Sequence, residues 1–210
     1  MKKYLAECIG TFFLIFCGTG AIIVHQTTGN LSPSGISAIF GAVVAIQIYL
    51  FGEASGAHFN PVVTLAFYLD KRFLAKDILP YWIAQLVGSV AASIMLQAFF
   101  PENTNLGMTL PSLGVFPALA FEMLMTCLLV WVILHLSKMK HPHTALIIGM
   151  TVALNAAFGG EVSGASMNPI RSLAPALVLG QFQNLWIYFI SPLIGAMFAV
   201  FLHRYFYKHD

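Results

Sequence analysis

One seven-residue pattern occurs twice in this sequence, and it constrains the fold more than any other feature. The first copy is 55–61 (SGAHFNP) and the second, 108 positions later (163 − 55), is 163–169 (SGASMNP). Both copies lead through small residues into an Asn-Pro pair, and a short apolar segment follows. Proline is favoured in the first turn of a helix, and asparagine is favoured as its N-cap. We therefore expect two half-length helices, at 60–70 and 168–179.

The composition indicates that lipid surrounds much of the chain. Only 9% of the residues are charged, 59% are hydrophobic and the mean hydropathy is +0.82. Soluble domains carry about 25% charged residues. The net charge of +2, without a basic patch among aromatic residues, gives no indication of a nucleic-acid partner. A bilayer span takes about 20 apolar residues, and six segments qualify: 4–24, 35–54, 78–100, 115–137, 143–159 and 184–206.

Neither the N-terminal segment nor the cysteines and histidines predict a separate site. Lys2 and Lys3 precede an apolar run, as in a signal peptide, but Glu7 interrupts that run and the hydrophobic pattern continues. We expect a retained first span. The three cysteines lie in apolar stretches without metal-binding spacing, and the two histidines around Pro142 fit a solvated loop better than a metal site or pH gate. No metal and no cofactor are expected.

The basic residues predict the orientation of the spans. Lysine and arginine concentrate in cytoplasmic loops. In a chain with six spans, nine of the ten basic residues fall on one side: Lys2, Lys3, Lys71, Arg72, Lys76, Lys138, Lys140, Arg204 and Lys208. We therefore expect both termini in the cytoplasm. The tenth, Arg171, lies inside the second half-length helix, at membrane depth.

The order of segments predicts an inverted repeat. Each half contains two spans, a half-length helix and a third span, so the second copy must be upside down. We expect one transmembrane domain over 1–210, with a first repeat at 1–105 and an inverted second repeat at 106–210. In such repeats the site lies at the membrane midplane between the halves. Further matches across the halves are Glu7 with Glu122, Trp82 with Trp186, Gln85 with Pro192, and Gly88 with Gly195.

The two loops predict a narrow path for uncharged molecules. Non-helical backbone at membrane depth persists only where protein buries it or water lines it. The positive ends of both half-length helices converge at the midplane, which repels cations and protons. There the side-chain amides of Asn60 and Asn168 can donate hydrogen bonds to a neutral oxygen. Backbone carbonyls along the loops can accept them; we expect the path to be lined by Gly56, Ala57, His58, Phe59, Gly164, Ser166 and Met167.

These motifs resemble those of the aquaporin (major intrinsic protein) family, and the resemblance covers about the whole chain. It is carried by Ala6-Glu7, by 52–64 and by 168–172, in which Ile170 replaces the usual alanine. The resemblance implies an all-α membrane protein of six transmembrane helices plus two re-entrant half-helices, with one pore in each protomer of a homotetramer. It also implies that the buried acids Glu7 and Glu122 accept hydrogen bonds from the backbone of the two loops.

The resemblance also maps a selectivity filter onto this sequence, at Phe40, Ala156, Ala165 and Arg171. Water-selective members usually carry histidine at the position of Ala156, and glycerol-conducting members carry Trp, Gly, Phe and Arg in the filter. The present set matches neither. Two alanines opposite one phenylalanine predict a wider, less polar constriction, unless Asn155 or Phe158 fills the gap.

Three other polar residues leave alternatives open. Arg171 could be a structural ion-pair member, with Glu161 as its partner. Glu53 and Glu161 each lie seven residues before an asparagine of the pair, where they could brace the loops or sit in the vestibules. His58 is expected to line the path.

The run 52–58 (GEASGAH) is similar to bacterial and nodulin-like intrinsic proteins. This resemblance implies a passive channel for water and small neutral solutes (glycerol, urea or neutral metalloid hydroxides) that excludes protons and ions. The short tails favour a bacterial inner membrane. The alternatives are a strictly water-selective aquaporin, a secondary transporter with inverted repeats, and a membrane-embedded enzyme. The enzyme is disfavoured because the seven histidines and three cysteines form no nucleophile–base or metal constellation.

Overall fold

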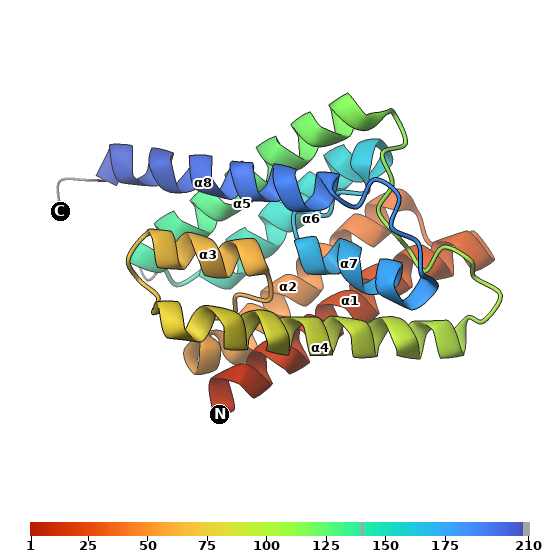
Figure 1. Ribbon diagram of the computed structural model, residues 1–210, viewed down its shortest axis with the longest axis horizontal. Helices are drawn as coiled ribbons and strands as arrows, with labels where there is room; N and C mark the ends of the chain where they lie inside the picture. The colour runs from red at the N-terminus through yellow and green to blue at the C-terminus, as the bar shows by residue number, and fades with distance from the viewer. Residues whose placement is uncertain (140, 208–210) are drawn as a thin grey trace.

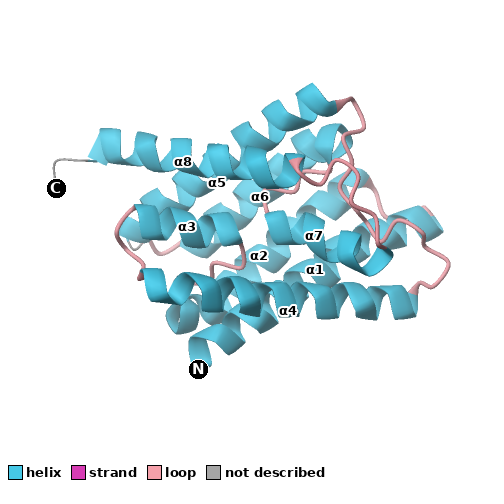
Figure 2. Cartoon of the chain, viewed as in Figure 1, coloured by secondary structure: helices cyan, strands magenta, loops and turns pink. Residues whose placement is uncertain are grey.

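The regular structure of this chain is helical throughout the part that the computed structural model describes, residues 1–139 and 141–207 (Figures 1 and 2). Lys140 and Lys208, two of the basic residues used to predict orientation, lie outside it. By length and composition, six of the helices in the described residues can cross a membrane. The helices are α1 (Lys2–Thr28), α2 (Pro33–Ser55), α3 (Pro61–Leu69), α4 (Ala75–Phe99), α5 (Val115–Met139), α6 (Thr144–Ser163), α7 (Pro169–Leu179) and α8 (Ile187–Tyr207).

The two half-length helices begin where the sequence predicts. The side-chain oxygen of Asn60 accepts a hydrogen bond from the backbone N–H of Val62 at 3.0 Å, and that of Asn168 accepts from Ile170 at 3.1 Å. These bonds satisfy N–H groups that the helix itself cannot pair. Both asparagines are therefore N-caps, and α3 and α7 start at the prolines that follow them.

The repeat is visible in the packing of the helices. α1 packs on α4 as α5 packs on α8, whereas α2 and α6 pack on each other across the centre. α3 contacts α8 of the other half, and α7 contacts α4. In Figure 1 the two half-length helices lie between α8 and α4, with α3 to the left and α7 to the right. The expected boundary between 105 and 106 falls in the loop that joins α4 to α5.

Small residues allow the long helices to cross closely. A Cβ atom on Gly88 of α4 would lie 2.1 Å from the carbonyl oxygen of Cys8 in α1, and one on Gly195 of α8 would lie 2.3 Å from that of Met123 in α5. Real Cβ atoms do not approach other atoms so closely, so only glycine fits. The match of Gly88 with Gly195 therefore corresponds to equivalent crossings in the two halves.

The match of Trp82 with Trp186 is wrong. Trp82 lies inside α4 and donates from its indole N–H to the carbonyl oxygen of Pro61, whereas Trp186 lies in the turn before α8. The two tryptophans are 104 positions apart, but the crossing glycines of these helices are 107 apart. The correct spacing pairs Tyr81 with Tyr188.

Candidate functional site

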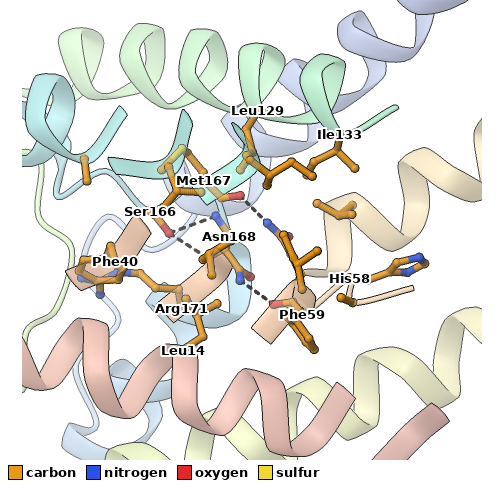
Figure 3. Close-up of a pocket in the computed structure, with 18 of the residues that line it drawn as sticks. Leu14, Phe40, His58, Phe59, Leu129, Ile133, Ser166, Met167, Asn168 and Arg171 are labelled. Atoms are coloured by element: carbon orange, nitrogen blue, oxygen red, sulfur yellow. Dashed lines mark hydrogen bonds between the residues drawn. The ribbon is translucent and has the colours of Figure 1, made fainter. Parts of the chain in front are cut away.

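Asn60 and Asn168 line the same cavity, and each forms a hydrogen bond with the loop of the other (dashed lines in Figure 3). The Nδ2 of Asn60 donates to the carbonyl oxygen of Met167 at 2.7 Å, and that of Asn168 donates to the carbonyl oxygen of Phe59 at 2.9 Å. Each amide nitrogen carries two hydrogens. One is used in this exchange, and the second is available to a molecule in the adjoining cavity, which both asparagines border.

A buried carboxylate holds the first loop. Glu7 of α1 accepts hydrogen bonds from the backbone N–H groups of His58 at 2.9 Å and Phe59 at 2.7 Å. It also accepts from the hydroxyl of Ser55 at 2.7 Å and the amide of Gln85 at 2.8 Å. All four bonds are donated to one side chain with no solvent exposure. The carboxylate therefore satisfies loop N–H groups that have no helical partner.

Glu122 of α5 performs the same task in the second loop. It accepts from the backbone N–H groups of Ser166 and Met167, both at 2.7 Å, and from the hydroxyl of Ser163 at 2.7 Å. The position of Gln85 is occupied by Pro192 in this half, so the fourth donor is missing. Glu53 and Glu161 are exposed and do not appear in either network of the described residues.

A pair of tyrosines that the sequence analysis missed completes the two loops. The hydroxyl of Tyr81 donates to the carbonyl oxygen of Ser55 at 2.7 Å, and that of Tyr188 donates to the carbonyl oxygen of Ser163 at 2.8 Å. These carbonyls lie at the C-terminal ends of α2 and α6, where no N–H group of the helix is available to donate to them. The 107-residue spacing that relates Gly88 to Gly195 also relates these tyrosines (188 − 81), and could have revealed them.

The loops have an unusual backbone. Within the two loops, four residues other than glycine have positive φ angles: Ala57 (52°), Phe59 (49°), Ala165 (44°) and Met167 (51°). Such conformations cost about 1–3 kcal/mol each and persist only where the surroundings impose them. The hydrogen bonds to Glu7 and Glu122 supply that constraint, since they fix the N–H groups of Phe59 and Met167 themselves.

Two cavities lie along the path through the molecule. A central cavity of about 70 Å³ borders both asparagines, and a vestibule of about 450 Å³ opens beside the loop that joins α4 and α5. Four residues border both cavities and so mark the boundary between them: Phe40, Ala156, Ala165 and Arg171. They are the four positions to which the resemblance maps the selectivity filter.

Arg171 supplies the charge at this boundary. Its side chain is nearly inaccessible, and its Nη1 donates to the carbonyl oxygen of Gly107 at 2.8 Å. The guanidinium carbon lies 5.6 Å from the centre of the Phe40 ring, within range of a cation–π interaction. Among the described residues its Nε and Nη2 have no hydrogen-bond acceptor, and no ion pair joins it to Glu161. Both donors are thus buried at the boundary without a protein acceptor.

The gap at Ala156 is not filled by the residues that the sequence suggested. Asn155 donates its side-chain amide to the carbonyl oxygen of Met125 at 3.0 Å and to the sulfur of Met167 at 3.1 Å, behind the loop. The side chain of Phe158 in α6 is 82% exposed on the surface of the molecule. Neither residue borders the two cavities. Neither side chain therefore fills the space beside Ala156.

Most of the expected path-lining residues border one of the cavities, but two differ from expectation. His58 borders the central cavity, yet its ring stacks on Phe67 with centroids 4.7 Å apart, and Figure 3 shows it turned away from Asn168. Its Nδ1 lies 3.1 Å from the hydroxyl of Thr64. Gly56 borders neither cavity; it ends α2 with a φ of 85°, as Gly164 ends α6 with a φ of 82°.

The fold and the paired loops define a membrane channel built from an inverted repeat. The sequence profile described as major intrinsic protein matches residues 1–203, and the chain belongs to this family. It is 38% identical over 209 residues to nodulin-26 from Glycine max, in an alignment that covers 97% of this chain and 77% of that protein. It is 39% identical over 217 residues to aquaporin NIP2-1 from Arabidopsis thaliana, with 97% and 75% covered.

The fold also agrees with a solved structure. The chain superimposes on the aquaglyceroporin from Plasmodium falciparum with a TM-score of 0.87, covering 96% of this chain and 94% of that one. The identity of 21% is low, so this likeness concerns the fold alone. Together with the six apolar helices in the described residues, the family shows an integral, multi-pass membrane protein of a channel family.

Proposed function

We propose that this chain conducts water together with small neutral solutes of the glycerol, urea or metalloid-hydroxide type. One observation carries the proposal: the residues common to the two cavities are one phenylalanine, one arginine and two alanines. Phe40 gives an apolar wall, and Arg171 gives two donors without a protein acceptor in the described residues. A molecule with hydroxyl or amide oxygens on one side and carbon on the other fits such a boundary.

The exclusion of ions follows from the centre of the path. The N-termini of α3 and α7 meet there, and each has a partial positive charge. Asn60 and Asn168 present N–H donors at the same point, which suits a neutral oxygen and repels a cation. Arg171 adds a full positive charge towards the vestibule. Protons and metal cations are therefore expected to be rejected without any moving part.

The proposed channel differs from a strictly water-selective aquaporin in the width of the path at Phe40, Ala156, Ala165 and Arg171. The direct test reconstitutes the purified protein in liposomes and follows shrinkage and re-swelling by light scattering in gradients of sucrose, glycerol and urea. We expect water flux with a low activation energy, and glycerol flux well above that of empty vesicles. If water passes but glycerol and urea do not, the result would support the strictly water-selective aquaporin instead.

A substitution makes the same test at one residue. Ala156→His adds an imidazole opposite Phe40 and should suppress glycerol flux while water flux continues. Ala156→Gly keeps the gap open and serves as the matched control. If Ala156→His conducts glycerol as well as the unaltered protein does, the position of Ala156 does not limit the path.

We also propose a homotetramer with one pore per protomer and both termini in the cytoplasm. The support is family membership and the distribution of basic residues among the loops. The relatives named above are plant proteins and give no support to a bacterial inner membrane. Solute flux that does not change with sodium or proton gradients would distinguish a channel from a secondary transporter. We propose no enzymatic activity.

A further inference from the structure

A chain of three buried hydroxyl groups links the loop between α4 and α5 to the second Asn-Pro loop. The hydroxyl of Thr109 lies 2.7 Å from that of Ser172, which in turn lies 2.6 Å from that of Ser166. Ser166 donates to the carbonyl oxygen of Asn168 at 2.8 Å, and this bond is among the dashed lines in Figure 3. All three hydroxyl residues are buried. Their hydroxyl groups therefore satisfy one another in place of bulk water.

The direction of these bonds follows from the number of hydrogens. A hydroxyl group carries one hydrogen, and Ser166 uses its hydrogen on the carbonyl oxygen of Asn168. Ser166 therefore accepts from Ser172. Ser172 has then used its own hydrogen and accepts from Thr109. Thr109 is thus the first donor of the chain, and among the described residues no other side chain donates to the hydroxyl of Ser172.

The first half has an equivalent hydroxyl at Thr64, which corresponds to Ser172 by the spacing of 108 that separates the two asparagines. The hydroxyl of Thr64 donates to the carbonyl oxygen of Asn60 at 3.1 Å. It lies 3.1 Å from Nδ1 of His58 in the same loop. It also accepts from the side-chain amide of Gln85 at 3.2 Å. In this half a donor therefore comes from the long helix α4.

The second half lacks that donor and uses the loop between α4 and α5 instead. Pro192 stands in α8 at the position of Gln85, and its side chain cannot donate a hydrogen bond. Thr109 supplies the missing donor from the loop that joins the two halves. The fit is close, since a Cβ atom on Gly164 would lie 2.9 Å from the Cα of Thr109. This loop is therefore a structural part of the second half as well as a connection.

The same short segment of the loop holds the guanidinium of Arg171. Nη1 of Arg171 donates to the carbonyl oxygen of Gly107, two residues before Thr109. Ser172, the partner of Thr109, follows Arg171 directly in α7. The segment is thus bonded to two adjacent residues of α7. Nε and Nη2 of Arg171 have no acceptor among the described residues, so the carbonyl of Gly107 is the protein acceptor that fixes the charged group.

We propose that Thr109 is a positioning residue for the filter residue Arg171. Its hydroxyl bond to Ser172 keeps the carbonyl oxygen of Gly107 in the place where it accepts from the guanidinium. This inference rests on the proposed function and deepens it. Without the bond, the loop segment loses its side-chain anchor on α7, and the guanidinium has other positions open to it. It then extends into the path for part of the time, where it obstructs glycerol and urea more than the smaller water molecule.

The test removes the hydroxyl and keeps the shape of the side chain. Thr109→Val should lower the ratio of glycerol to water permeability about fivefold, or about 1 kcal/mol, which is typical of one hydrogen bond. Both fluxes are measured in the same vesicles, so the ratio does not depend on how many channels are folded. Thr109→Ser keeps the hydroxyl and should restore the ratio. Thr151→Val is the matched control, because the buried hydroxyl of Thr151 bonds to Ile147 of its own helix.

A double-mutant cycle separates positioning from a general structural role. In the Arg171→Ala background the group that Thr109 positions is gone, so Thr109→Val should change the ratio no further. A fivefold drop that persists in this background would overturn the inference, as would an unchanged ratio in Thr109→Val alone. If Thr109→Val folds poorly, Ser172→Ala removes the same bond from the side of α7. It should lower the ratio in the same sense, and an unchanged ratio there counts equally against the inference.

Failure of the proposed function has a different signature. If the unaltered protein passes water but neither glycerol nor urea, the proposed solute class is wrong. Positioning is then measured by water permeability per channel, with the protein in the vesicles counted by immunoblot. Thr109→Val should lower it, Thr109→Ser should restore it, and the effect should vanish in Arg171→Ala; any other pattern rejects the positioning role too. If the unaltered protein passes glycerol and Thr109→Val keeps the same ratio, only the positioning role is rejected.

Discussion

Asn60 and Asn168 each donate a hydrogen bond to the carbonyl oxygen of the residue that precedes the other, at Met167 and Phe59. Each asparagine also caps its own half-length helix. The exchange couples the start of one half-helix to the loop of the other. The two halves are thereby joined at the centre of the path by two buried hydrogen bonds.

Asn168→Asp tests this exchange. Aspartate keeps the capping oxygen for Ile170 but loses the N–H that the carbonyl of Phe59 accepts. Leaving a buried acceptor without its donor costs about 1–3 kcal/mol, and the new negative charge faces that carbonyl. We expect lower thermal stability and reduced water flux, measured by melting in detergent and by vesicle shrinkage. Asn30→Asp, in the exposed loop before α2, is the matched control. Unchanged flux would show that the donor is dispensable.

Glu122→Gln tests the support of the second loop. The amide presents an NH₂ group to one of the N–H donors of Ser166 and Met167, so at least one hydrogen bond is lost. Hydrogen bonds to charged groups contribute about 1.5–3 kcal/mol. We expect the melting temperature to fall and water flux to drop as the loop relaxes. Glu102→Gln, on an exposed loop, should change neither. A variant as stable as the control would contradict the role assigned to Glu122.

Gly88→Ala tests the crossing of α1 and α4. The added methyl would lie 2.1 Å from the carbonyl oxygen of Cys8, so the helices must separate. Overpacking of this kind costs about 1–3 kcal/mol. Gly52→Ala is the control, because no atom lies within 4 Å of a Cβ there and alanine favours the helix. We expect opposite shifts in melting temperature for the two variants; a shift of the same sign and size would refute the close crossing.

Ala165→Cys tests whether the boundary between the two cavities lies on the conducting path. Ala165 borders both, whereas Cys8, Cys17 and Cys127 border neither. Mercurial reagents should therefore leave the water flux of the unaltered protein nearly intact and block that of Ala165→Cys, with recovery after added thiol. Ala91→Cys, on an exposed part of α4, should stay open when labelled. If the labelled Ala165→Cys variant still conducts water freely, Ala165 does not line the conducting path.

Signals local in the chain were sufficient for the outline of the fold. The six spans follow from hydropathy, and the starts of α3 and α7 follow from the capping chemistry of Asn60-Pro61 and Asn168-Pro169. The filter positions could be mapped because the family resemblance fixes their distance from the two asparagines. The networks around Glu7 and Glu122 were expected in kind, but their donors Gln85, Ser55 and Ser163 were not identified.

The sequence by itself determined how many helices cross the membrane, where the two half-helices begin and that the halves are inverted, because hydropathy and capping act within a few turns of the chain. Only the tertiary structure decided which apolar side chains face the path. Helices in lipid are apolar all round. Phe158, which is exposed, and Ile148, which lines the central cavity, therefore look alike in sequence. Their difference arises when helices from both halves pack together and assign one face to lipid and the other to the path.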